Sequence, residues 1–235
     1  MNNTQLQIKF KQRLNKLASN DFDNIECWQI VEAFNKAQIE WCRRQLRGTN
    51  QYKDGDEMSK RRVDDLQILL ETTTLLGQDT PAYSSVTYNN FPEDYLEYKK
   101  ITAYAKKDCC NEPHLMQVYL AEAANVNLIM RDPLKCPSYE WGETFATMQG
   151  NTIRVYYKDF SFITSQLQYY RKPRNIEIAG CTDPVDGGLS QQDVECEFKD
   201  DIAEIIIDEA VTVIAGDIND VNQYMRGSAS AEKNN

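Results

Sequence analysis

The sequence predicts an α+β fold, in which an N-terminal helical hairpin and a C-terminal helix flank an antiparallel β region. At both ends of the chain, apolar residues recur every three or four positions, which is the spacing of one helix face. Between them, short runs rich in valine, isoleucine, threonine and tyrosine are separated by glycine and proline, as in strands. Because no internal repeat or long linker divides the chain, we expect one domain over residues 1–225, followed by a flexible tail over residues 226–235.

Two helices are expected near the N-terminus. The first carries Leu6, Phe10 and Leu14 on one face, with lysines and an arginine between them. Residues 21–24 supply side chains that can cap a second helix, whose apolar side runs from Cys27 to Trp41. Since the link between them is short, the two helices are predicted to form an αα-hairpin.

The β region is expected after a polar loop at residues 48–58 and a short third helix from Ser59 to Leu70. A further short helix is expected over residues 115–129, and Gln149–Gly150–Asn151 is a predicted hairpin loop. A closing helix should begin near Asp200, where acidic residues suit the positive end of the helix dipole. The predicted strands are residues 83–88, 101–105, 144–148, 152–157, 160–164, 167–171, 174–178 and 194–198.

Length and cysteine content indicate a protein that folds without disulfides or metal. A chain of this size buries about 70% of its extended surface. The seven cysteines are irregularly spaced, and some occupy apolar helix positions, so we expect free thiols. No apolar run approaches the ~20 residues of a membrane span, and the N-terminal segment lacks the apolar core of a signal peptide. The sequence therefore predicts a protein made and kept in a cytosol, without membrane contact.

The net charge of −10 argues against nonspecific binding to duplex DNA, which needs a basic patch to release counterions. Two interpretations of the acidic balance stay open. An acidic surface suits a channel through which DNA must slide without sticking. Equally, negative charge keeps a protein soluble.

Catalytic and metal chemistry have little support in the sequence. The single histidine, His114, follows Cys109 and Cys110, with Cys136 further along, but adjacent cysteines do not have the spacing of zinc ligands. Acidic pairs such as Asp200–Asp201 stand in loops or at helix starts, where capping and solvation are common roles. Nucleotide-binding glycine motifs and a nucleophile elbow are absent. We therefore expect no enzymatic activity and no cofactor.

Thirteen tyrosines are the more informative feature. Tyr169 and Tyr170 precede Arg171, and such a group can stack on single-stranded nucleic acid. Tyrosine and arginine are also enriched in protein–protein interfaces. Given the acidic total, the protein interface is the favoured interpretation.

Several motifs together resemble the adaptor proteins of the head–tail connector in short-tailed bacteriophages, with the greatest similarity to ring proteins of crAss-like phages of Bacteroides. They are the helix Ile30–Leu46, the turn Phe91–Leu96, the run Tyr169–Pro173 followed by Ile176, and the terminal helix Asp201–Val213. The resemblance spans residues 25–225, and it rests on the order and spacing of the motifs.

The resemblance implies a virion structural protein that forms a ring of twelve copies beneath the portal, extends the DNA channel and provides a platform for tail attachment. The implied partners are the portal protein, neighbouring copies and a downstream tail or second ring protein, while DNA passes without specific binding. Assembly is expected in the host bacterial cytoplasm. The candidate interface residues are Tyr169, Tyr170, Arg171, Asp201, Glu204, Asp208, Tyr224 and Arg226.

Opposite charges on the first and last helices could join neighbouring copies of such a ring, or both helices could simply face water. The alternative functions are another phage ring or tail component, a cytosolic scaffold and, with the least support, an enzyme that uses a metal or a carboxylate pair.

Overall fold

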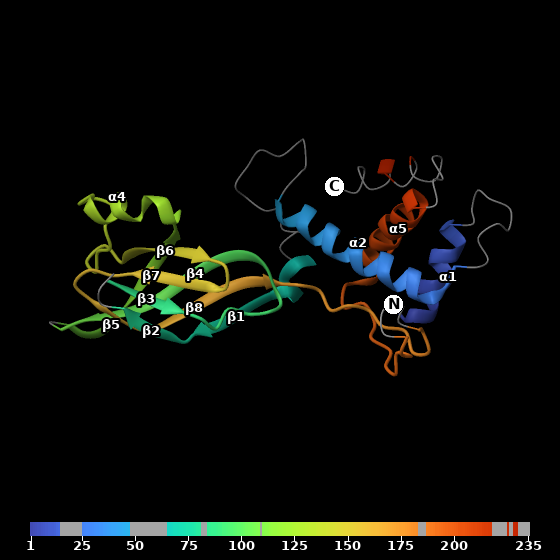
Figure 1. The fold of residues 1–235 in the computed structure, drawn as a ribbon, viewed down its shortest axis with the longest axis horizontal. Coiled ribbons are helices and arrows are strands. Elements are labelled where there is room, and N and C mark those ends of the chain that lie inside the picture. Colours follow the sequence, from blue (N-terminus) through green and yellow to red (C-terminus); the bar gives the residue numbers. More distant parts are fainter. Residues whose placement is uncertain are drawn as a thin grey trace. The chain divides into compact units, whose positions relative to one another are not determined.

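The computed structural model describes residues 1–14, 25–47, 65–80, 84–108, 110–182, 187–217, 225 and 228–229. The chain forms two compact units (Figure 1). One comprises Met1–Ile68 and Pro173–Asn235, and the other comprises Leu69–Lys172. The α+β class is confirmed. A single domain over residues 1–225 stays a prediction, and the predicted tail lies outside the described residues except for Ser228 and Ala229.

The first unit is helical and contains α1 (Asn3–Leu14), α2 (Cys27–Arg47) and α5 (Asp200–Asp217). In this unit α5 packs against both α1 and α2 (Figure 1). The apolar faces predicted from the helical spacing supply the core, which includes Phe10, Phe34 and Ile206. The predicted N-terminal hairpin is not confirmed, because α1 and α2 share α5 as their main packing partner and residues 15–24 lie outside the described residues.

An irregular segment, residues 173–199, completes the helical unit. The strands predicted at 174–178 and 194–198 reduce to a single antiparallel bridge between Glu177 and Val194. A disulfide joins Cys27 at the start of α2 to Cys181, with the two Cα atoms 5.7 Å apart. The prediction of seven free thiols is therefore wrong for these two cysteines, since the fold brings them within disulfide distance from 154 positions apart.

The second unit is an eight-stranded sheet with the order β1-β8-β4-β5-β6-β7-β3-β2. Its outermost strands β1 and β2 are separated in sequence only by Leu76, so the sheet must curl until its two edges approach each other (Figure 1). Alternate residues such as Ile101, Met116, Val118 and Leu167 fill the inside of the curl. The strands are β1 (Leu70–Leu75), β2 (Gly77–Thr80), β3 (Ser85–Tyr88), β4 (Tyr95–Lys107), β5 (Cys110–Leu120), β6 (Glu143–Gln149), β7 (Thr152–Tyr156) and β8 (Ser161–Arg171).

One strand pair overturns the prediction of a purely antiparallel sheet, because β5 and β6 run parallel. A parallel pair needs a crossover connection, and residues 121–142 supply it. They contain the 3-10 turn η3 (Ala123–Asn125) and the short helix α4 (Val126–Arg131). The helix predicted over residues 115–129 is wrong in its first part, since Leu115 to Leu120 extend β5.

The segment before β1 also differs from the prediction. Asp65 and Leu66 are helical and η1 (Gln67–Leu69) is a 3-10 turn, but Leu70 already pairs with Tyr170 in the sheet. The first part of the predicted third helix lies outside the described residues. The predicted hairpin loop is confirmed: Met148 pairs with Ile153 across Gly150, whose φ of +55° favours glycine.

Candidate functional site

Tyr169 of the predicted interface is buried in the sheet unit. Its hydroxyl donates a hydrogen bond to Asp94 Oδ1 at 2.9 Å, and its ring stacks on Tyr95 at a centroid distance of 5.9 Å. Burial and this hydrogen bond raise the pKa of Tyr169. The side chain therefore ties β8 to the turn before β4.

Tyr170 and Arg171 are likewise engaged within the sheet. The ring of Tyr170 is buried beneath Lys99, whose Nζ lies 5.9 Å from the ring centroid. Arg171 Nε lies 2.9 Å from Glu71 Oε1 on the neighbouring strand β1. An interface role for these residues stays a prediction. Within the chain, their contacts join β8 to its neighbours β4 and β1.

The acidic residues predicted on the last helix lie on α5, and two of them, Glu204 and Asp208, face α1. Glu204 accepts hydrogen bonds from Lys9 and Arg13, and Arg13 also lies 3.0 Å from Asp208. Although partial burial opposes ionisation, these cations hold the pKa of Glu204 below its usual range. The opposite charges of the first and last helices thus pair within one chain. Of the three predicted acidic residues, Asp201 alone has no partner in the described part of the chain; Tyr224 and Arg226 lie outside it.

The outer face of the sheet carries a group of exposed apolar side chains, which we call the β5 surface. It comprises Tyr104, Leu115 and Tyr119, and we include with it Trp141 of the crossover segment that follows β5. Tyr104 and Leu115 are direct cross-strand partners, and Tyr119 lies on the same face of β5 as Leu115 by strand alternation. Trp141 precedes Gly142. The carbonyl of Gly142 accepts a hydrogen bond from the backbone amide of Gln117 on β5. Leu115 on β5 is 55% exposed and Trp141 in the crossover segment is 80% exposed, so large apolar groups face water here.

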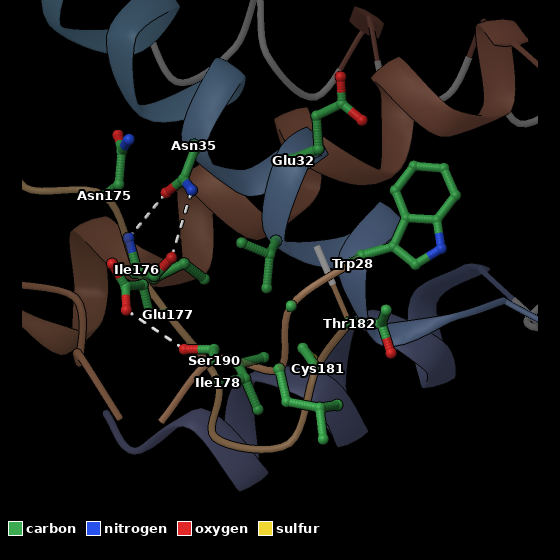
Figure 2. A pocket seen from close by; sticks show the side chains of 13 residues that line it. Trp28, Glu32, Asn35, Asn175, Ile176, Glu177, Ile178, Cys181, Thr182 and Ser190 are labelled. Atoms are coloured by element: carbon green, nitrogen blue, oxygen red, sulfur yellow. Dashed lines mark hydrogen bonds between the residues drawn. The ribbon is translucent and has the colours of Figure 1, made fainter. Parts of the chain in front are cut away.

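A second candidate site is a hollow of about 580 Å³ in the helical unit, which we call the α2 groove (Figure 2). One wall is α2, through Trp28, Val31, Glu32 and Asn35, and the other is formed by residues of the 175–190 segment. Figure 2 shows Trp28 towards one end of the groove, and Asn35 with Asn175 towards the other. A volume of this size lies within the range of small-molecule and peptide-side-chain sites, about 300–1,000 Å³.

Asn35 fixes the two walls of the groove to each other. Its Oδ1 accepts the backbone N–H of Ile176 at 2.8 Å, and its Nδ2 donates to the carbonyl of the same residue at 3.3 Å (Figure 2). At the other end, the disulfide from Cys27 holds Cys181 in the groove wall. The groove is thus a preformed feature, held at two places.

The groove is missed by sequence reasoning because its walls come from segments about 140 residues apart. Residues 182–188 are recognisable as a loop, and α2 is recognisable as a helix, but no pattern pairs them. The sequence signal that could have paired them is the two cysteines, Cys27 and Cys181. The chain has an odd number of cysteines at irregular spacing, so the sequence does not show which two pair.

The most strongly perturbed acid of the helical unit is Glu209 on α5, with only 4% of its surface exposed. Its Oε1 accepts from Arg44 at 2.6 Å, whereas its Oε2 has no hydrogen-bond partner among the described residues. Burial raises the pKa of Glu209 to about 7, against the opposing effect of Arg44. Burial and nearby acidic groups raise the pKa of the Cys42 thiol to about 12, so this cysteine is a poor nucleophile.

Of the residues considered for metal binding, Cys109 lies outside the described residues. His114 is exposed, and its ring lies 5.2 Å from that of Tyr139. Cys136 lies near Lys158, with Sγ 3.7 Å from Nζ. Within the described ranges, no three His, Cys, Asp or Glu side chains are placed to hold a metal ion.

None of the helices in the described part of the chain is both long and apolar enough to cross a membrane. In comparisons with known proteins, no family model matches the chain and no curated protein matches it.

Proposed function

We propose that the chain is a virion structural subunit, an adaptor of the head–tail connector that forms a ring beneath the portal of a short-tailed bacteriophage. The ring would extend the DNA channel and present a platform for the tail. The proposal rests on the ordered motifs between residues 25 and 225 that resemble such adaptors.

The observation that carries an assembly role is the β5 surface. Side chains of tryptophan, tyrosine and leucine are the groups whose removal from water drives protein association, and tryptophan and tyrosine dominate interface energies. Leu115 and Trp141 are both exposed, and Gly142, which follows Trp141, is hydrogen-bonded to Gln117 on the strand that carries Leu115. Such a face is suited to contact a different surface on a neighbouring copy, as a closed ring requires.

A second observation limits which contacts hold the ring. Glu204 and Asp208 already face Lys9 and Arg13 within the chain, so these charges are not free to join one copy to the next. The proposed contact between copies is therefore apolar burial of the β5 surface.

The first experiment is negative-stain imaging of the purified protein, alone and mixed with the portal of the same phage. We expect a new ring layer with one subunit per portal subunit. Residues 226–235 are the candidate segment for docking onto the portal. A ring layer that survives their deletion keeps the adaptor role and excludes this segment from portal binding.

A surface variant tests the contribution of the β5 surface. Leu115→Ser with Trp141→Ser should abolish the ring layer while leaving the circular dichroism spectrum unchanged, because both side chains are mostly exposed in the subunit. The matched control is Ile8→Ser, an exposed apolar residue of the helical unit, which should leave the layer intact. A bare portal with the unaltered protein, together with absence from virions, would contradict the structural role altogether.

A further inference from the structure

The wall of the α2 groove that faces the helix contains a short hairpin, which we call the Cys181 hairpin. Its described residues are 180–182 and 187–190. A β-bridge joins its two arms, and the backbone amide of Ser190 donates to the carbonyl of Cys181 at 2.9 Å. Within the described part of the chain, the hydrogen bonds of this hairpin all go to partners in residues 177–192, so none of them joins it to α2.

The base of the hairpin is fixed to the helices. Ile176 is bound to Asn35 of α2 through both of its backbone groups. Asn3 of α1 donates from Nδ2 to the carbonyl of Glu177 at 2.8 Å and to Asp193 Oδ1 at 3.1 Å. The chain therefore enters and leaves the hairpin at two positions that hydrogen bonds hold independently of the disulfide.

The disulfide is the covalent link between this hairpin and α2. Among the described residues of the hairpin, Cys181 alone is buried, and its neighbours Gly180 and Thr182 are exposed. Because ordering a hairpin costs backbone entropy at each residue, burial of one small side chain does not suffice to hold it on the helix. The bond to Cys27 supplies the rest. Cys27 is half-buried at the start of α2, so a small thiol can reach the bond.

We propose that the Cys27–Cys181 disulfide is a reversible redox latch on the α2 groove. When a thiol opens the bond, the Cys181 hairpin leaves α2 and the groove loses the lining that the hairpin supplies, while α1, α2 and α5 keep their packing. The hairpin contributes five of the thirteen lining residues, namely Cys181, Thr182, Gly188, Leu189 and Ser190. Disulfides in a reducing compartment, such as the host cytoplasm where assembly is expected, are usually transient and redox-sensing. The inference does not depend on the adaptor role, because both cysteines belong to the single chain.

The opening reaction is a thiol–disulfide exchange with a dithiol such as dithiothreitol. One thiolate of the reductant attacks one sulfur of the bond and forms a mixed disulfide, which releases the first cysteine. The second thiol of the reductant then displaces the other cysteine. Two electrons and two protons pass from the dithiol to the two cysteines, and the products are two thiols and one cyclic oxidised reductant. Oxidised glutathione reverses the reaction and leaves with two reduced glutathione molecules.

The first test measures the accessibility of Cys181 in the full chain. The oxidised chain and the chain reduced with dithiothreitol, each freed of small thiols under nitrogen, are alkylated briefly with iodoacetamide, and peptide mass spectrometry reads each cysteine. In the oxidised chain Cys181 should stay unlabelled. In the reduced chain it should react at least about tenfold faster than Cys42, whose buried thiol reports that the helices stay packed.

The second test follows the indole N–H signals of the three tryptophans by NMR. Trp28→Phe and Trp141→Phe assign the signals. Reduction should move the Trp28 signal, because Trp28 lines the groove together with the hairpin, and oxidised glutathione should return it (Figure 2). The Trp41 signal should stay in place, since its ring packs on Phe198 with the centroids 5.2 Å apart.

A variant opens the latch without a reductant. Cys27→Ser cannot form the bond, so Cys181 should be alkylated in this variant as fast as in the reduced unaltered chain. The matched control is Cys42→Ser, which removes a free buried thiol of the same helix and should leave Cys181 bonded and unlabelled. Circular dichroism checks that both variants fold, and the reduced unaltered chain provides the same measurement without a substitution.

Three outcomes overturn the proposal. Slow labelling of Cys181, equal to that of Cys42 in the reduced chain, shows that the hairpin stays on α2 without the bond. Fast labelling of both cysteines, with a displaced Trp41 signal, shows that the bond holds the whole helical unit together rather than the hairpin. A Trp28 signal that oxidised glutathione does not restore shows that the opening is irreversible.

Discussion

Glu209 makes the stability of the helical unit depend on pH. Its pKa of about 7 in the folded chain lies above the ordinary value of 4.5 because the carboxyl is buried. Protonation therefore favours the folded state. The stability that this carboxyl contributes is fully present below about pH 4.5 and is lost as the pH rises through about 7.

Glu209→Gln should remove this dependence, because the amide is neutral at every pH and can still accept from Arg44. Between about pH 5 and about pH 8, the free energy of unfolding of the unaltered chain should fall by about 1–3 kcal/mol relative to that of the variant. Urea denaturation at the two pH values measures the difference. Glu32→Gln, at an exposed position of α2, should follow the unaltered chain, and parallel curves for all three proteins would contradict the assignment.

Single residues were the hardest feature to predict from the sequence. Successive residues of a strand normally point to opposite faces, yet Tyr169 and Tyr170 are both buried. Tyr169 faces the inside of the curled sheet, and Tyr170 is covered by Lys99. A tyrosine pair beside an arginine has the composition of an interface, and only the placement of neighbouring strands shows that both rings are buried within the chain.

Among the elements, long segments with one clear period are predicted well and short segments are not. The helices α2 and α5 and the β6–β7 hairpin occur where the patterns place them. In contrast, Leu66, Leu69 and Leu70 fit a helical spacing although Leu70 begins β1. The segment Leu115–Leu120 is so short that its apolar residues fit a helical and a strand spacing equally well. It forms a strand because it pairs with β4 and β6.

Asn35 attaches the 175–190 segment to α2 through its two hydrogen bonds to Ile176. Asn35→Ala removes both hydrogen bonds to Ile176 and leaves the backbone amide of this buried residue without its partner. We expect a loss of about 1–2 kcal/mol in the free energy of unfolding. Urea denaturation measures the loss, and Asn175→Ala, an exposed asparagine of the same groove, should have little effect. Equal effects of the two changes would show that the side-chain clamp is unimportant.

For the whole molecule, the disulfide between Cys27 and Cys181 is a long-range covalent constraint. It closes a loop of 154 residues, which restricts the unfolded chain. Cys27→Ser with Cys181→Ser should lower the free energy of unfolding by about 2–5 kcal/mol.

Thermal unfolding with and without a reducing agent checks this prediction. The reductant should lower the melting temperature of the unaltered chain and leave that of the double variant unchanged. Cys42→Ser provides the control for loss of a buried thiol outside the disulfide. If the reductant does not change the melting temperature of the unaltered chain, the disulfide does not stabilise the fold.

The same bond decides how the protein carries a pulling force. Every residue of the sheet unit, Leu69–Lys172, lies inside the covalent loop, and both ends of the chain lie outside it. Tension applied between the two ends of the chain passes through the disulfide from Cys27 to Cys181. The strands of the sheet unit therefore do not bear this tension. Stretching the oxidised chain to full length should yield a contour shorter by roughly 500 Å than that of the reduced chain, at about 3.5 Å per residue.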